Sequence, residues 1–270
     1  MMKKLLILVI ALALTNIANA DFTDSFDTPF DYVINGPGAY DGMLDPGAVT
    51  EVLDASTTVA GSLYYQTNGS IWEGNVQGPL LYKNITGNFI ATVKVAISGE
   101  AGNESFHNGA GIMARDPAGA ESFVSIDRFV WTAFIAWSAH NDGTTVARDE
   151  YGQTTGLWIE DTYAVAAPYP WIQLQRNGSD FYFRISSDGV NFIPLTDPAY
   201  LGIYDGTQTA LVLSRPDLPN TLQVGLHQVM YDVVSGSATF DDFSIQEIPE
   251  PATIMLLGLG ALTLLRKRRS

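Results

Sequence analysis

The chain has 270 residues, no cysteine and a formal net charge of −15 at neutral pH. The lack of cysteine excludes disulfides and thiol chemistry, so the hydrophobic core must supply the stability. Residues 21–250 contain eight basic and 29 acidic residues, a net charge of −21, which disfavours binding to nucleic acid or to an anionic membrane. Such a surface suits a divalent cation or an uncharged ligand.

The first 20 residues have the features of a secretory signal peptide. Lys3 and Lys4 precede an apolar stretch at residues 5–14, and Ala18-Asn19-Ala20 is an A-x-A cleavage site for signal peptidase. We therefore expect the mature chain to begin near Asp21 and residues 1–20 to take no part in the fold.

Short β-segments separated by turn residues fill the body of the chain, residues 21–247. Strands are predicted, in chain order, at residues 62–66, 89–95, 110–115, 122–127, 133–137, 171–176, 181–185, 191–193, 223–229 and 238–245. The clearest hairpin surrounds Asn177-Gly178, since Asn-Gly supplies the two positive φ angles of a type I′ turn. Many strands at this spacing predict a single all-β domain folded as an antiparallel sandwich.

The first strand of that hairpin alternates between two kinds of residue. Trp171, Gln173 and Gln175 share one face, while Ile172 and Leu174 share the other. Despite this alternation we expect Trp171 to lie in the core, because aromatic side chains usually fill it.

Five short motifs follow one another between about residue 78 and residue 245. They are Gly78–Lys83 with Gly87-Asn88-Phe89, Gly111–Asp116, Trp171–Arg176, Ser187–Phe192, and Val224-Gly225-Leu226 with Ala238–Phe243. This series resembles bacterial domains of the concanavalin A-like lectin/glucanase superfamily that accompany secreted glycosidases. The resemblance implies a lectin-like jelly roll of two large, curved antiparallel sheets. It departs from the family at Phe192, where a tryptophan is common.

Catalysis by a glycoside hydrolase of this superfamily would need two carboxylates close together on one strand. The expected spacing, Glu-x-Asp-x-x-Glu or Glu-x-Asp-x-Glu, does not occur in the sequence. The nearest acidic pairs, Asp149-Glu150 and Glu160-Asp161, are adjacent residues, which point to opposite faces of a strand. A hydrolase would therefore require a noncontiguous carboxylate pair, and we predict no catalytic residue.

Calcium is the cofactor that the acidic residues suggest, because it prefers oxygen ligands. Asp24 and Asp27 lie near the mature N-terminus, and Asp241 and Asp242 lie in the last predicted strand. The first and last strands of a jelly roll are commonly neighbours, so these four side chains are the candidate metal ligands. The alternative is an acidic surface that binds no metal.

Carbohydrate binding is suggested by aromatic residues that occur near polar ones. The candidate ligand-binding residues are Trp131 and Trp137 with Arg115 and Asp127, and a second group of Trp72 and Tyr64. The alternative is that most of these aromatic side chains fill the core.

The last residues, 248–270, form a three-part segment. Pro249-Glu250-Pro251 precedes an apolar run at residues 252–265, and Arg266, Lys267, Arg268 and Arg269 follow. At about 1.5 Å per residue the run would form a helix of about 21 Å, shorter than most membrane spans. The four cations should stay cytoplasmic, so the body lies across the membrane.

This segment resembles the PEP-CTERM sorting signal of Gram-negative bacteria. The resemblance implies processing by an exosortase, transient anchoring in the inner membrane through the C-terminal helix, and delivery to the cell surface or extracellular matrix. An unprocessed C-terminal anchor is the alternative.

Together these observations predict an exported, non-catalytic carbohydrate-binding protein linked to exopolysaccharide, with a polysaccharide as its partner. Two alternatives stay open. One is a glycoside hydrolase with a noncontiguous carboxylate pair, and the other is a purely structural surface protein.

Overall fold

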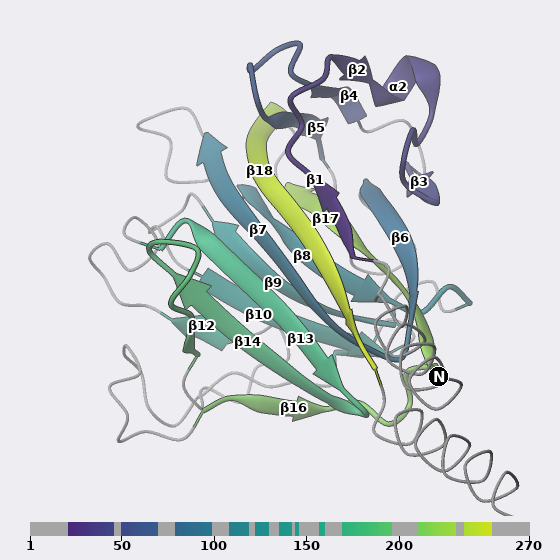
Figure 1. Ribbon diagram of the computed structural model, residues 1–270, viewed down its shortest axis with the longest axis vertical. Coiled ribbons are helices and arrows are strands. Elements are labelled where there is room, and N and C mark those ends of the chain that lie inside the picture. The colour runs from purple at the N-terminus through teal and green to yellow at the C-terminus, as the bar shows by residue number, and fades with distance from the viewer. Residues whose placement is uncertain are drawn as a thin grey trace, which may run out of the picture.

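The computed structural model describes residues 21–45, 50–69, 79–98, 108–118, 122–129, 135–141, 144–145, 157–159, 169–195, 210–230 and 235–249. These residues form two antiparallel sheets that pack face to face (Figure 1). The prediction of an all-β sandwich is therefore confirmed. One short helix, α2 (Tyr32–Asn35), occurs in the described part of the chain.

The first sheet has ten strands among the described residues. Its order is β15 (Ile193–Pro194), β14 (Asp180–Ser186), β13 (Trp171–Asn177), β7 (Asn88–Ser98), β18 (Ser235–Ile248), β5 (Leu63–Asn68), β4 (Thr50–Ala55) and β2 (Phe30–Asp31). In addition, β1 (Phe22–Asp24) pairs with β18, and β16 (Val212–Ser214) pairs with β14. The expectation that the first and last strands are neighbours is confirmed.

The second sheet has eight described strands. Its order is β11 (Thr144–Thr145), β10 (Ile135–Asn141), β9 (Phe123–Phe129), β8 (Asn108–Arg115), β17 (Thr221–Met230), β6 (Leu80–Thr86) and β3 (Gly42–Leu44), with β12 (Leu157–Ile159) paired to β10. In Figure 1 the strands β8, β9 and β10 lie behind β7, β13 and β14 of the first sheet.

Alternation along the strands sets the core between the sheets. In β7, Phe89, Ala91 and Val93 are fully buried, whereas Thr92 is half-buried and Lys94 is exposed. Each buried side chain of the size of valine or phenylalanine stabilises the fold by about 1.5–3 kcal/mol relative to exposure. The inward residues of β8, β9 and β17 meet them from the second sheet in one continuous cluster.

The two sheets differ in their outer faces. Every residue of β8 is buried, and a second apolar cluster of Leu80, Met113, Phe123, Phe129 and Val229 lies on the outer face of the second sheet. The outer face of the first sheet is instead half-exposed and polar along β7, β13 and β18. Within the described residues, the first sheet therefore offers the more open surface to a ligand.

The predicted hairpin forms, but its turn differs from the prediction. Asn177 and Asp180 are paired, so the two loop residues are Gly178 and Ser179. Gly178 has φ +61°, while Asn177 and Ser179 are not among the residues with positive φ. One glycine with positive φ at the first loop position fits a type II′ turn rather than type I′.

Gly111 should be the most sensitive glycine of the second sheet. A Cβ atom there would lie 1.9 Å from the backbone oxygen of Ile126 and 2.6 Å from Oδ1 of Asp127. We expect Gly111→Ala to lower the free energy of unfolding in urea by about 3 kcal/mol through overpacking. As the control, a Cβ atom at Gly178 would meet no atom within 4 Å. Gly178→Ala should therefore lower the free energy of unfolding by only about 1 kcal/mol, because alanine disfavours the positive φ of this position. Equal losses would contradict this packing.

Candidate functional site

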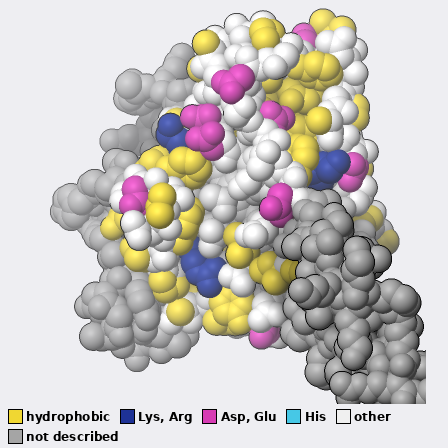
Figure 2. Space-filling model, viewed as in Figure 1, with side chains coloured by type: hydrophobic (Ala, Val, Ile, Leu, Met, Phe, Trp, Pro, Cys, Tyr) yellow, Lys and Arg dark blue, Asp and Glu magenta, His cyan; other side chains and the backbone are white. Residues whose placement is uncertain are grey.

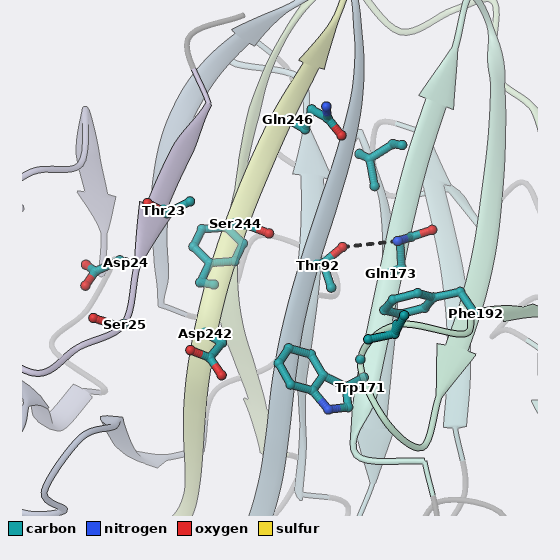
Figure 3. A pocket seen from close by; sticks show the side chains of 14 residues that line it. Thr23, Asp24, Ser25, Thr92, Trp171, Gln173, Phe192, Asp242, Ser244 and Gln246 are labelled. Atoms are coloured by element: carbon teal, nitrogen blue, oxygen red, sulfur yellow. Dashed lines mark hydrogen bonds between the residues drawn. The ribbon is translucent and has the colours of Figure 1, made fainter.

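A groove of about 620 Å³ opens on the outer face of the first sheet (Figure 3). It is built where β1, β18, β7 and β13 lie side by side and where residues 189–192 follow β14. Its lining consists of Thr23, Asp24, Ser25, Ile90, Thr92, Trp171, Gln173, Gly189, Val190, Phe192, Asp242, Phe243, Ser244 and Gln246. The groove thus combines aromatic rings with hydroxyl, amide and carboxylate groups.

The floor of the groove is a row of polar residues from neighbouring strands. Thr23 pairs with Ser244, Ser244 with Thr92, and Thr92 with Gln173. The Arg184 guanidinium donates to Oε1 of Gln173 at 3.1 Å, and Nε2 of Gln173 donates to Oγ1 of Thr92 at 3.2 Å. These bonds fix the orientation of the amide, so the floor presents a pre-arranged set of hydrogen-bonding groups.

Arg184, at the end of this row, is partly withdrawn from water. Burial lowers the pKa of its guanidinium below the usual range, and the nearby Tyr182 partly offsets this effect. The guanidinium also lies 5.7 Å from the centre of the Tyr182 ring. Its position supports the floor rather than forming part of the groove lining.

The aromatic side of the groove is formed by Trp171 and Phe192, which are both half-buried. Our expectation that Trp171 belongs to the core is therefore wrong. A Cβ atom on Gly189 would lie 2.7 Å from Cε2 of the indole, and Gly189 has φ +75°. Only glycine lets the loop approach the ring this closely, so the loop holds the indole in place.

Asp188 organises the loop that carries Gly189 and Phe192. Its Oδ1 accepts hydrogen bonds from the backbone N–H of Asn191 at 2.8 Å, from that of Val190 at 2.9 Å and from the Ser186 hydroxyl at 2.9 Å. These bonds, led by the Asn191 N–H, hold the pKa of the Asp188 carboxyl well below its usual range. Because its folded-state pKa is depressed, Asp188 contributes fully to loop stability above its ordinary pKa of 3.8 and loses that contribution progressively as the pH falls from there through the folded-state pKa.

A β-bulge shapes the edge of the groove. The register of β18 against β7 shifts between Asp241 and Ser244, and Asp242 has φ +50°. Phe243 is buried inside the bulge, where its ring packs edge-on against Phe22 at 6.0 Å. Bulges re-aim side chains, and here the exposed Asp242 lies next to Trp171 (Figure 3).

The structure does not assemble the four predicted calcium ligands. Asp24 and Asp242 line the groove, but Asp27 accepts a hydrogen bond from Ser25, and Asp241 pairs with Lys94 at 3.2 Å. Burial raises the pKa of Asp24, and the backbone N–H of Phe26 partly offsets this. Within the described ranges no three acidic, histidine or cysteine side chains converge, whereas calcium takes six to eight oxygen ligands. Calcium binding stays a prediction.

Of the predicted sugar-binding residues that the structure describes, Arg115, Asp127 and Trp137 lie on the second sheet and Tyr64 lies on the first. Arg115 and Asp127 are buried on the outer face of the second sheet, whereas Tyr64 is half-exposed on the first sheet and outside the groove lining. Trp137 lies in β10, where its backbone pairs with Ile126. Trp72 and Trp131 lie outside the described residues, as do the acidic pairs at residues 149–150 and 160–161.

Asp127 instead belongs to a buried polar cluster. Its Oδ1 lies 2.6 Å from Nε2 of His227, and its Oδ2 accepts a hydrogen bond from Ser125 at 2.7 Å. Gly111 pairs with both Asp127 and His227, so the carboxylate and the imidazole meet across a residue without a side chain. The carboxylate lies between the hydroxyl and the imidazole, unlike a nucleophilic triad, in which histidine lies between the other two groups.

Most of the groove residues have no distinguishing signal in the sequence. The alternation along residues 171–175 places Trp171 and Gln173 on one face, and it is the sequence feature that points to this part of the groove. Thr92 and Ser244 join them only through the pairing of β7 with β13 and β18, and the sequence did not fix that pairing.

The comparisons with known proteins address sorting and fold. A family profile for the PEP-CTERM protein-sorting motif matches residues 247–269. No curated protein matches the chain in sequence.

Among solved structures, a functionally unknown protein from Saccharomyces cerevisiae is similar, with 16% identity over 77% of this chain and 96% of that chain and a TM-score of 0.52. The GH43 protein BlXynB from Bacillus licheniformis is 14% identical over 84% of this chain, with a TM-score of 0.52. The xylan β-1,4-xylosidase from Bacillus halodurans C-125 is 14% identical over 83% of this chain, with a TM-score of 0.50. This chain spans 39% of the length of each of those two proteins. At these identities the likeness confirms a jelly-roll β-sandwich fold and nothing further.

The buried pair and a surface pair should differ in their effect on stability. Asp127→Ala removes the carboxylate beside the buried His227 and the Ser125 hydroxyl, and leaving such buried polar groups without their partner typically costs about 1–3 kcal/mol. The matched control Asp241→Ala breaks the exposed pair with Lys94, which should cost less than about 1 kcal/mol. Urea unfolding measures both, and a loss below 1 kcal/mol for Asp127→Ala would show that the pair is dispensable.

Proposed function

We propose that this protein binds an uncharged polysaccharide in the groove of the first sheet, without catalysing its cleavage, at the cell surface or in the extracellular matrix. The observation that carries the proposal is the polar row from Thr23 to Gln173 next to the rings of Trp171 and Phe192. A ligand-binding groove combines apolar surface with a few placed polar groups, and this groove has both.

A sugar ring matches this lining in two ways. Its C–H faces can lie against an aromatic ring, while its hydroxyls can both donate and accept hydrogen bonds. Thr92 and Ser244 offer hydroxyls, and Gln173 and Gln246 offer amides. The Gly189 loop and the Arg184–Gln173 bond hold these groups before a ligand arrives, which lowers the entropy cost of binding.

The charge of the groove favours an uncharged ligand over an anionic one. The charged residues in its described lining are Asp24 and Asp242, both acidic. The net charge of −21 over residues 21–250 adds to the repulsion of a polyanion. The groove is therefore suited to neutral glycans, including an exopolysaccharide without acidic sugars.

The termini supply the location. The sorting motif at residues 247–269 marks an exported protein, and we propose that signal peptidase and an exosortase process its two ends. The apolar run at residues 252–265, predicted as the membrane helix, lies outside the described residues. In the part of the chain that the structure describes, no helix is long and apolar enough to cross a membrane.

Binding explains the groove better than glycoside hydrolysis does. Hydrolysis requires two carboxylates that flank the sugar bond. Figure 3 shows Asp242 beside Trp171, whereas Asp24 lies on the far side of β1 and points away from the indole. Two of the similar structures are a GH43 protein and a xylosidase, which agrees with a polysaccharide ligand.

Affinity electrophoresis tests this function with the exported protein purified in mild detergent. Gels containing β-glucan, xylan, galactomannan, dextran or alginate would be run with calcium and with a chelator. We expect at least one neutral polymer to retard the protein and alginate to have no effect. Trp171→Ala should lower the affinity for that polymer, measured from the retardation, at least tenfold, which corresponds to about 1.4 kcal/mol.

The control for this experiment is Val212→Ala, which shortens an exposed apolar side chain of the first sheet outside the groove lining. It should bind like the wild type. Phe192→Ala provides a second groove variant if Trp171→Ala unfolds at a lower temperature. Retardation by no neutral polymer, or equal retardation of wild type and both groove variants, would contradict the proposed function.

A further inference from the structure

A second aromatic ring lies on the same open face as the groove. Tyr64 of β5 is half-buried and pairs with Thr239 of β18. Two residues further along β18, Asp241 pairs with Lys94, which in turn pairs with Trp171. Tyr64 and Trp171 therefore lie on strands separated by β18 and β7, and both belong to the outward-facing set of the first sheet.

The register gives the separation of the two rings. Three strand spacings of about 4.8 Å place β5 about 14 Å from β13, and an offset of two residues adds about 7 Å along the strands. The two Cα atoms are therefore about 16 Å apart. This distance is several times the width of one sugar ring, so only an oligomer can contact both aromatic side chains.

The surface between the two rings is free of bulky apolar side chains and offers polar groups to such an oligomer. The outward positions on this diagonal are Lys94, Ala96, Thr239 and Asp241, and none of them carries a large apolar side chain. Lys94 and Asp241 pair at 3.2 Å and so neutralise each other locally. Figure 2 shows isolated charges on a largely uncharged face here. A neutral, hydroxyl-rich polymer suits this surface better than a charged one.

The Tyr64 ring is held in place, as Trp171 is. Its hydroxyl donates to Oε1 of Gln66 at 3.0 Å, and Nε2 of Gln66 donates to Oε2 of Glu51 at 2.6 Å. This chain of bonds orients the amide beside the ring. A ring with an adjacent fixed amide repeats the arrangement of Trp171 with Gln173 in the groove.

We infer that the groove is one end of an extended binding track, which crosses β7 and β18 diagonally to a second stacking position at Tyr64. The track takes a linear, uncharged polysaccharide of several sugar units rather than a free sugar. This inference rests on the proposed function of the groove and adds the length of the ligand to it.

Isothermal titration of the exported protein with cello-, xylo- and manno-oligosaccharides of two and six units tests the track. In at least one series the six-unit sugar should bind at least tenfold more tightly than the two-unit sugar. Tyr64→Ala should lower the affinity for the six-unit sugar about tenfold and leave the affinity for the two-unit sugar unchanged. Tyr64→Phe, which retains the ring but loses the bond to Gln66, should lose less of the six-unit affinity than Tyr64→Ala, and the control Val212→Ala should behave like the wild type.

The possible results separate the track from the groove. If Trp171→Ala weakens both lengths while Tyr64→Ala changes neither, the track is wrong and the groove alone binds. Equal affinity for two and six units in all three series would also overturn the track. If no oligosaccharide binds, or if Trp171→Ala has no effect on any of them, both the track and the proposed function fail.

Discussion

Backbone pairing of β18 holds the groove together. Along one edge β18 pairs with β7, and along the other it pairs with β5 and β1. This single strand therefore places residues 22–24 beside residues near position 90 and, through β7, beside the hairpin at residues 171–186. Its bulge turns Phe243 into the core and leaves Asp242 at the groove edge. Loss of this pairing would separate the polar row from the aromatic side.

The two sheets divide structural and binding roles. The central strands β8, β9 and β17 of the second sheet are buried on both faces, and their outer face carries an apolar cluster and the Asp127–His227 pair. These enclosed groups contribute to packing. They also favour one register of β8 against β9 and β17, because only glycine at position 111 leaves room between Asp127 and His227. The first sheet buries only its inner face, so its outer residues can meet a ligand. This asymmetry explains why the groove lies on the first sheet.

Alternation and turn chemistry predicted most of the fold. Residues 171–185 were predicted as a hairpin because apolar and polar residues alternate around Asn177-Gly178, and the strands β7, β8, β9, β17 and β18 each appear within a few residues of their predicted positions. The turn type was predicted wrongly because Asn177 stays in the strand. The groove was predicted only in part: Asp24 and Asp242 were selected as metal ligands, and Trp171 was assigned to the core. The bulge at Asp241–Ser244 has no local sequence signal, since it arises from pairing with a distant strand.

Side-chain NMR of the protein labelled with ¹⁵N at tryptophan tests the central claim most directly. The indole N–H signal of Trp171, assigned by its loss in Trp171→Phe, would be followed during titration with a neutral oligosaccharide of six units that binds in calorimetry. The account predicts a saturable shift of this signal at the calorimetric affinity. An unchanged Trp171 signal during saturable binding would show that the polysaccharide binds elsewhere and would contradict the account.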